Sequence, residues 1–134
     1  MDTGPLFALV DPDDRDHQRA KDDLAKLNDE GYGLVIIHST LLEAYALILH
    51  RLGIPTAHRW VMEIWESVEL LEPRPEQYAA AVAKVTQYKD QDITLFDSRA
   101  AVVAKDLRWP VWTYDHHFDV MGSAVWRARG RSLE

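Results

Sequence analysis

Four acidic residues are placed where the chain could build a metal site by folding. Asp2, Glu43, Asp97 and Asp115 each fall where a short apolar run ends or where a helix is expected to begin. Carboxylate oxygens are hard ligands that suit Mg²⁺ or Mn²⁺, and the sequence has no cysteine that would indicate softer coordination. The spacing therefore predicts a carboxylate site for a divalent cation.

Two of these acids also have a purely structural explanation. Thr40 and Glu43, like Thr94 and Asp97, have the spacing of a capping box, with a hydroxyl at the N-cap and an acid at the third helical position. Either acid taken alone could be a cap. The metal hypothesis depends on all four acids together, because clustered carboxylates repel and a cation relieves that repulsion.

The other two acids leave alternatives open as well. Asp2 could be a surface residue, and Asp115 could cap the segment that follows it. Asp119 lies one turn after Asp115 and is the reserve metal ligand. The six histidines form no HExxH pattern, and His116 and His117 could contact a phosphate or remain in solvent.

The elements that must position these acids alternate between helices and strands. Periodicity and capping signals predict helices at 14–30, 41–52, 55–67, from 75 to the acidic loop at 90–92, and 94–107; strands are expected at 34–37, 68–71, 111–114 and 124–126. This alternation indicates an α/β fold with a mainly parallel sheet and helices on both faces. In such a sheet all four acids map to the edge where strands end and helices begin, and where ligands bind.

Composition limits the function classes. The 134 residues fit a single domain, which we expect to span 1–126, with a mobile tail at 127–134 whose last two residues could be a cloning remnant. A net charge of −7 opposes nonspecific binding to a nucleic-acid backbone, so a polyanionic substrate must be met by a local cation or basic patch. No apolar stretch is long enough to span a membrane and no signal peptide is evident, which makes a cytoplasmic location the default.

Four stretches of the chain resemble the PIN-domain ribonucleases, especially the VapC-type toxins of toxin–antitoxin pairs. They are DTGPLFALVDPDD, the acid in STLLEAYALI, YKDQDITLFDSRAAVVA and VWTYDHHF, in the family's order, and the resemblance covers Met1 to about Trp126. It implies a three-layer α/β fold with an acidic Mg²⁺ or Mn²⁺ pocket. The residues that match the family's acidic positions are Asp2, Glu43, Asp97 and Asp115, with Thr3 as the hydroxyl beside the first acid.

The chain departs from the family pattern in two places. Only Met1 precedes Asp2, although the family's first strand normally comes before this acid, so the strand is very short or the start is truncated. Many relatives carry a further acid two positions after the one matched by Asp115, where this chain has His117. Asp119 could serve as this further acid.

The reaction that these residues indicate is metal-dependent hydrolysis of an RNA phosphodiester. Asp2 and Asp97 are the expected direct ligands, Glu43 and Asp115 would orient metal-bound water or a second ion, and Arg99 could contact phosphate. One alternative, a haloacid-dehalogenase-like phosphatase, needs a second Asp two residues after the first, where this chain has Gly4. The other is a noncatalytic interaction module in which the acids are caps.

Two kinds of protein partner are expected. Five Trp, five Tyr and three Phe are many large aromatics for a small core, and with the resemblance they predict a homodimer. The helices at 41–52 and 55–67 should form an antiparallel hairpin, on which Trp60 and Trp65 point about 140° apart around one axis. At least one should line an exposed apolar surface, where the resemblance implies that an antitoxin docks.

Overall fold

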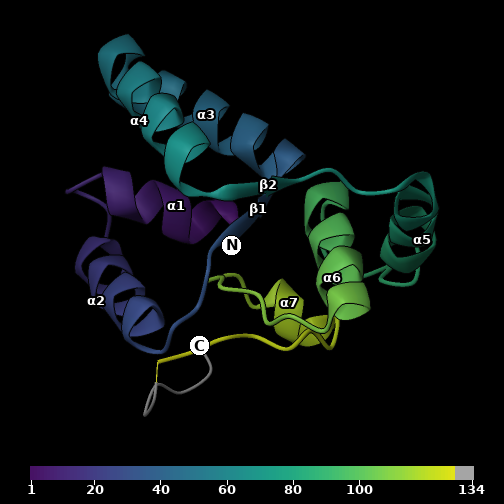
Figure 1. The fold of residues 1–134 in the computed structure, drawn as a ribbon. Coiled ribbons are helices and arrows are strands. Elements are labelled where there is room, and N and C mark those ends of the chain that lie inside the picture. The colour runs from purple at the N-terminus through teal and green to yellow at the C-terminus, as the bar shows by residue number, and fades with distance from the viewer. Residues whose placement is uncertain (129–134) are drawn as a thin grey trace. The chain divides into compact units, whose positions relative to one another are not determined.

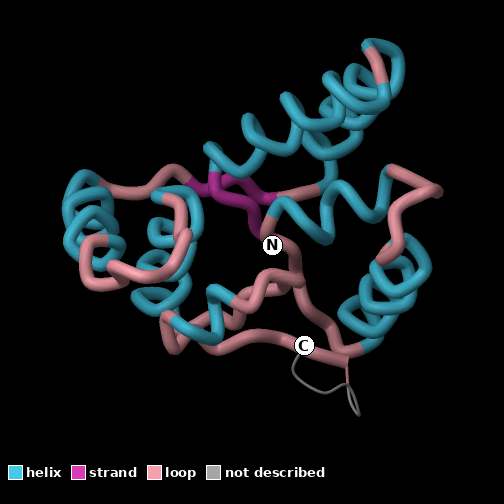
Figure 2. Tube along the Cα trace, turned by 180° about the vertical axis from the view of Figure 1, so that it is seen from behind, coloured by secondary structure: helices cyan, strands magenta, loops and turns pink. Residues whose placement is uncertain are grey.

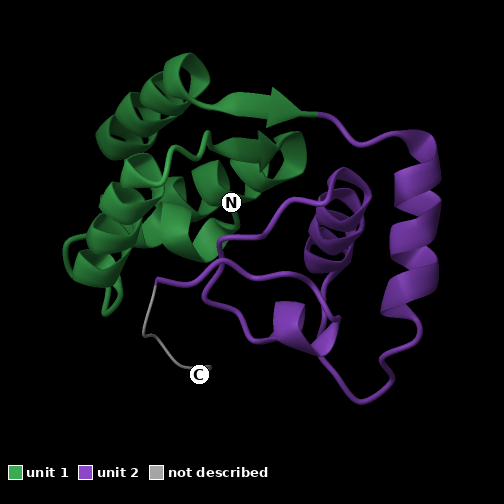
Figure 3. Cartoon of the chain, turned by 60° about the horizontal axis from the view of Figure 1, so that its bottom comes forward, with its two compact units in different colours: residues 1–71 green, residues 72–134 purple. Residues whose placement is uncertain are grey.

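The computed structural model describes residues 1–128, and residues 129–134 of the expected tail lie outside the described part. The chain forms two compact units, Met1–Leu71 and Glu72–Glu134 (Figure 3). Each unit has its own elements and its own set of buried side chains.

Unit 1 is built from four helices and a pair of short strands (Figure 1). Its elements are α1 (Thr3–Val10), α2 (His17–Asp29), β1 (Val35–Ile37), α3 (His38–Leu52), α4 (Ile54–Ser67) and β2 (Glu69–Leu71). The two strands run parallel, with Val35 opposite Glu69 and Ile37 opposite Leu71. Both segments were expected to be strands of a mainly parallel sheet, and their parallel pairing agrees with that expectation.

The core of unit 1 joins the α3–α4 hairpin to α1 and β1. Ile36 and Ile48 are fully buried, and Trp60 is only 5% exposed. The hairpin turns at Gly53, whose φ of 91° lies in a region that glycine adopts without steric cost. Pro55 stands in the first turn of α4, where its missing N–H removes no helical hydrogen bond.

Unit 2 contains three described helices connected by long loops (Figure 2). They are α5 (Pro75–Val85), α6 (Leu95–Leu107) and α7 (His117–Val120). The buried Ser98 hydroxyl donates to the carbonyl of Ala81 at 2.7 Å, which ties α6 to α5. Beyond α6, Val111 and Val125 form an isolated parallel bridge with backbone hydrogen bonds of 2.8 Å on both sides.

A second apolar cluster holds the carboxyl-terminal half of unit 2 together. It consists of Ile93, Ala101, Val111, Phe118 and Met121. Phe118 is fully buried, so the four-residue α7 is anchored by one large side chain. No helix in residues 1–128 is long and apolar enough to cross a membrane.

The structure corrects three expectations about local elements. The segment after Asp2 forms helix α1, for which the sequence analysis had assigned no element. Helix α3 begins at His38, directly after β1, so Glu43 lies in its second turn and the predicted capping box with Thr40 is wrong. Where strands were expected at 111–114 and 124–126, the described chain pairs only Val111 with Val125.

Candidate acidic metal site

The acids of unit 1 lie at the N-cap of α1 and in the second turn of α3. The Thr3 hydroxyl donates a hydrogen bond to Oε1 of Glu43, which joins the start of α1 to α3. Asp2 occupies the N-cap position of α1 with an extended backbone. The structure therefore brings the predicted hydroxyl together with one of the four predicted acids.

The amino group of Met1 lies beside these residues. It donates to the carbonyl of Val35 at 3.0 Å, so the start of the chain is attached to β1. Burial lowers the pKa of this amino group from 8.0 to about 6, and the adjacent Asp2 carboxylate opposes the shift. The same group thus connects the N-cap of α1 to the strand that precedes α3.

In unit 2, Asp97 lies in the first turn of α6. The Thr94 hydroxyl accepts a hydrogen bond from the backbone N–H of Asp97 at 3.2 Å, so Thr94 is the N-cap. The prediction that the Thr94 hydroxyl caps this helix is confirmed. In this bond the donor is the backbone of Asp97.

Arg99, the predicted phosphate contact, packs against two aromatic rings. Its guanidinium lies 5.0 Å from the ring centre of Tyr78 and 5.5 Å from that of Phe96. The Tyr78 hydroxyl donates to Glu72 at 2.8 Å, and this hydrogen bond is the main cause of a raised pKa at Tyr78. Arg99 is thus held by cation–π contacts between α5 and α6.

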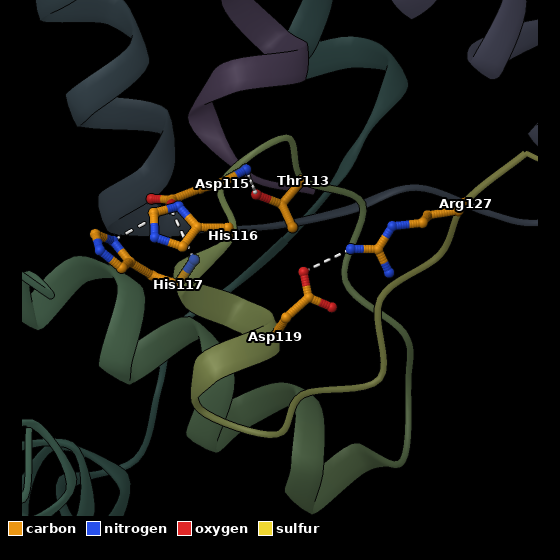
Figure 4. Close-up of polar contacts among 6 residues, drawn as sticks. All are labelled: Thr113, Asp115, His116, His117, Asp119 and Arg127. Carbon is orange, nitrogen blue, oxygen red and sulfur yellow. Dashed lines mark hydrogen bonds and ion pairs between the residues drawn. The ribbon is translucent and has the colours of Figure 1, made fainter. Parts of the chain in front are cut away.

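Asp115 precedes α7 and is held by its neighbours (Figure 4). Its backbone N–H donates to the Thr113 hydroxyl at 3.0 Å, and its Oδ1 accepts from the backbone N–H of His117 at 2.9 Å. The second bond is an Asx turn, so the expectation that Asp115 caps the following segment agrees with the geometry. The same oxygen lies 3.2 Å from Nδ1 of His117 and 3.8 Å from Nδ1 of His116.

Asp115, His116 and His117 form a group whose potential ligand atoms all lie within 4.8 Å of one another. Among residues 1–128, this is the group whose side chains could hold a metal ion. The two histidines were not expected to be metal ligands, because the six histidines of the chain form no HExxH pattern. The consecutive Asp-His-His at the end of an extended segment was the signal that could have identified them.

Asp119, the reserve ligand, is engaged by a cation. Arg127 donates to its Oδ2 at 2.5 Å, and both side chains are about one-quarter exposed, at 28% for Asp119 and 25% for Arg127. Figure 4 shows this pair apart from the two imidazoles. Arg127 and the 3%-exposed Ala128, which we assigned to the tail, therefore make defined contacts within the described chain.

The predicted site residues divide between the units. Asp2, Thr3 and Glu43 belong to unit 1, and Asp97, Arg99, Asp115 and Asp119 belong to unit 2. Within unit 1 the structure joins Thr3 to Glu43, and within unit 2 it surrounds Asp115 with nitrogen donors. Carboxylate and imidazole, the donor types around Asp115, are those of a site for a divalent cation, and Glu43 offers a further carboxylate.

The chain matches a known protein family over most of its length. Residues 1–123 match the PIN domain family, and the chain belongs to this family. Its structure is similar to that of VapC20 from Mycobacterium tuberculosis, a toxin that cleaves the sarcin–ricin loop. The TM-score is 0.81 at 17% sequence identity, and the match covers 95% of this chain and 97% of that chain. No curated protein matches the sequence. The predicted PIN-like α/β fold is confirmed.

Proposed function

We propose that the protein is a metal-dependent endoribonuclease and the toxin of a toxin–antitoxin pair, acting in the cytoplasm. The observation that carries this proposal is the PIN-domain match over residues 1–123, which contains all four predicted acids. The fold likeness to VapC20, a toxin that cleaves RNA, supports the same reaction class. With VapC20 only 17% identical, the RNA that this chain cleaves is left open.

The acids would hold Mg²⁺ or Mn²⁺, with Asp2 and Asp97 as direct ligands and Glu43 and Asp115 orienting water or a second ion. A divalent cation bound there supplies Lewis-acid polarisation of the phosphate and a water of lowered pKa. The protein's own part is to fix the carboxylates. Thr3 does so by donating to Glu43, and the Asx turn does so at Asp115.

Asp97→Asn is the central test of this function. The substitution is nearly isosteric and removes one anionic ligand oxygen, and its backbone bond to Thr94 is retained. We expect RNA cleavage in Mg²⁺ or Mn²⁺ to fall by about 100-fold or more, a loss in the range that single catalytic groups supply. Cleavage would be measured on total RNA, with sequencing of the new ends to identify the target.

Asp22→Asn is the matched control, because it removes the same charge from an exposed position on α2. Circular dichroism and thermal unfolding would confirm that both variants are folded. Full cleavage by folded Asp97→Asn protein would exclude the assigned site. Equal losses in both variants would instead indicate a general effect of charge.

The antitoxin is proposed to dock on an exposed stripe of α4. Ile54, Met62 and Trp65 are 59%, 60% and 64% exposed, and their spacing of eight and three positions places them on one helical face. Trp60 points into the core instead, so the prediction that the two tryptophans face different directions is confirmed. An exposed apolar stripe of this kind suits an amphipathic partner helix.

Docking on this stripe, defined as Ile54, Met62 and Trp65, is tested with Trp65→Ala. The chain would be co-expressed with the neighbouring small open reading frame, and complex formation would be measured by pull-down. Trp109→Ala is the matched control, since Trp109 is 46% exposed and lies in unit 2. Loss of the complex only in Trp65→Ala would support the docking site, and unchanged binding would exclude it.

Self-association into a homodimer remains part of the proposal. Light scattering at tens of micromolar would give twice the 15.4 kDa chain mass for a dimer. Trp65→Ala in the same experiment tests whether the dimer also forms through the α4 stripe. A variant that stays dimeric but loses the antitoxin would assign the stripe to the antitoxin.

The alternative function is a noncatalytic interaction module whose acids serve as caps. The Asx turn of Asp115 favours it, because this turn gives the carboxylate a structural role. A module of this kind should bind neither Mg²⁺ nor Mn²⁺. Calorimetric titration with each ion therefore distinguishes it from the nuclease.

A further inference from the structure

The group formed by Asp115, His116 and His117 offers two nitrogen donors beside one carboxylate. The imidazole rings of His116 and His117 lie 4.4 Å apart between centres and are tilted by 41°. All three residues present a potential ligand atom within 4.8 Å of the other two. The rings and the carboxylate lie close together in Figure 4.

Nδ1 of each imidazole lies near Oδ1 of Asp115, at 3.8 Å for His116 and 3.2 Å for His117, and the two rings lie against each other. The side chain of His117 is 17% exposed and that of His116 is 61% exposed, so both can be reached by an ion from solvent. The nearby cation Arg127 is paired with Asp119.

Hydrogen bonds within the chain orient the carboxylate of Asp115. Its Oδ1 accepts from the backbone N–H of His117, and the Thr113 hydroxyl fixes the backbone of Asp115. A ligand held in this way loses little freedom when it coordinates an ion. One potential ligand atom of each imidazole already lies within 4.8 Å of the carboxylate oxygen and of the other imidazole.

Neutral imidazole nitrogen is a borderline donor that suits Mn²⁺, Zn²⁺ and related transition ions, whereas Mg²⁺ prefers oxygen. A site with two imidazoles and one carboxylate therefore prefers Mn²⁺ over Mg²⁺ more strongly than a site made of carboxylates alone. It also leaves coordination positions open for water and for an oxygen of a phosphate. This difference in metal preference comes from the imidazoles of His116 and His117.

We propose that His116 and His117, with Asp115, coordinate the divalent cation of this protein through nitrogen and make the site selective for Mn²⁺ over Mg²⁺. This inference rests on the proposed function only in that Asp115 is one of its acids. Metal binding to the free protein tests it without RNA. The competing explanation is that His117 only donates a hydrogen bond to Asp115 and orients it.

Pulsed electron paramagnetic resonance of the Mn²⁺-loaded protein is the direct test. Nitrogen coordinated to Mn²⁺ modulates the spin echo, and a site of oxygen ligands alone does not give this signal. We expect a nitrogen modulation in the unaltered chain and its loss in the double variant His116→Ala/His117→Ala. Mn²⁺ bound to the unaltered chain with no nitrogen modulation would overturn the proposal.

Calorimetric titration with Mn²⁺ and Mg²⁺ tests the selectivity between the two ions. Each single substitution, His116→Ala or His117→Ala, should weaken Mn²⁺ binding by about tenfold or more and Mg²⁺ binding by much less. His117→Asp replaces nitrogen by carboxylate and should move the preference back toward Mg²⁺. His50→Ala, an exposed histidine of α3, is the matched control and should change neither affinity.

The outcomes separate this inference from the proposed function. Nitrogen-coordinated Mn²⁺ without RNA cleavage would support the site and reject the nuclease. RNA cleavage with Mn²⁺ bound through oxygen alone would reject the role of the histidines and leave the nuclease standing. Equal weakening of Mn²⁺ and Mg²⁺ in the histidine variants would also overturn the selectivity.

Discussion

The two units position their acids by different means. In unit 1, Glu43 lies within a 15-residue helix that is packed on the core through Ala44 and Ile48. In unit 2, Asp115 lies in a loop between an isolated bridge and a helix of four residues. The first carboxylate is fixed by a long helix, and the second by individual side-chain and backbone hydrogen bonds.

This difference indicates where each acid is vulnerable. A long helix distributes its stability over many backbone hydrogen bonds, so losing one side-chain contact at Glu43 should have a small effect. A four-residue helix has no stability of its own and depends on the few groups that anchor it. Substitutions around Asp115 should therefore cost more than equivalent substitutions around Glu43.

Phe118→Ala should have the largest effect. Phe118 is fully buried in the cluster that anchors α7, and removing such a ring costs about 3–5 kcal/mol. Urea denaturation would measure the loss, with Val120→Ala as the control, since Val120 lies on the same helix and is 40% exposed. Similar losses in the two variants would mean that α7 is not anchored by Phe118.

Thr113→Val should come next. It removes the hydroxyl that accepts from the backbone N–H of Asp115, at a site only 5% exposed, and a buried unsatisfied donor costs about 1–3 kcal/mol. Thr113→Ser keeps the hydroxyl and should retain most of the stability. If Thr113→Val leaves the stability unchanged, the hydrogen bond does not set the position of Asp115.

Thr3→Val tests the equivalent contact in unit 1. The hydroxyl that donates to Glu43 is lost, and we expect a cost of about 0.5–1.5 kcal/mol because the carboxylate is only partly buried. Thermal unfolding of Thr3→Val, compared with that of Thr3→Ser, measures this loss of stability. A loss of stability larger than that of Thr113→Val would contradict the expectation that substitutions around Asp115 cost more than those around Glu43.

The ion pair between Arg127 and Asp119 should contribute least. Both side chains are partly exposed, so solvent screens the attraction and a coupling of about 0.2–1 kcal/mol is expected. A double-mutant cycle of Arg127→Met and Asp119→Asn isolates it, and added salt should reduce it. A coupling above this range that persists in high salt would show that the pair is a major anchor of unit 2.

The long periodic helices were predictable from the sequence. Helices expected at 14–30, 55–67 and 94–107 correspond to α2, α4 and α6, each within three residues at either end. Their signals are local, such as Pro55 in the first turn of α4 and Thr94 as the cap of α6. Helix α1 was missed because the run from Leu6 to Val10 is apolar throughout, and periodicity cannot separate a buried helix from a buried strand there.

The site was predictable in its residue types and less so in its contacts. The hydroxyl at Thr3 was expected beside the first acid, whereas its hydrogen bond to Glu43 depends on how α1 packs on α3. The clustering of His116 and His117 with Asp115 depends on the turn before α7, for which the sequence carries no periodic signal. Contacts between distant segments come from tertiary packing, which a linear pattern does not encode.

The parallel pairing of β1 with β2 has a consequence for the order in which unit 1 folds. Pairing Val35 with Glu69 closes a long loop, and the entropy lost in closing it must be recovered by only three residues on each strand. The α3–α4 hairpin forms from local contacts and brings the two strand ends together, so it should fold before the strands pair. We therefore expect the amide protons of β1 and β2 to exchange with solvent no more slowly than those of the hairpin, since any opening of the hairpin also releases the strands.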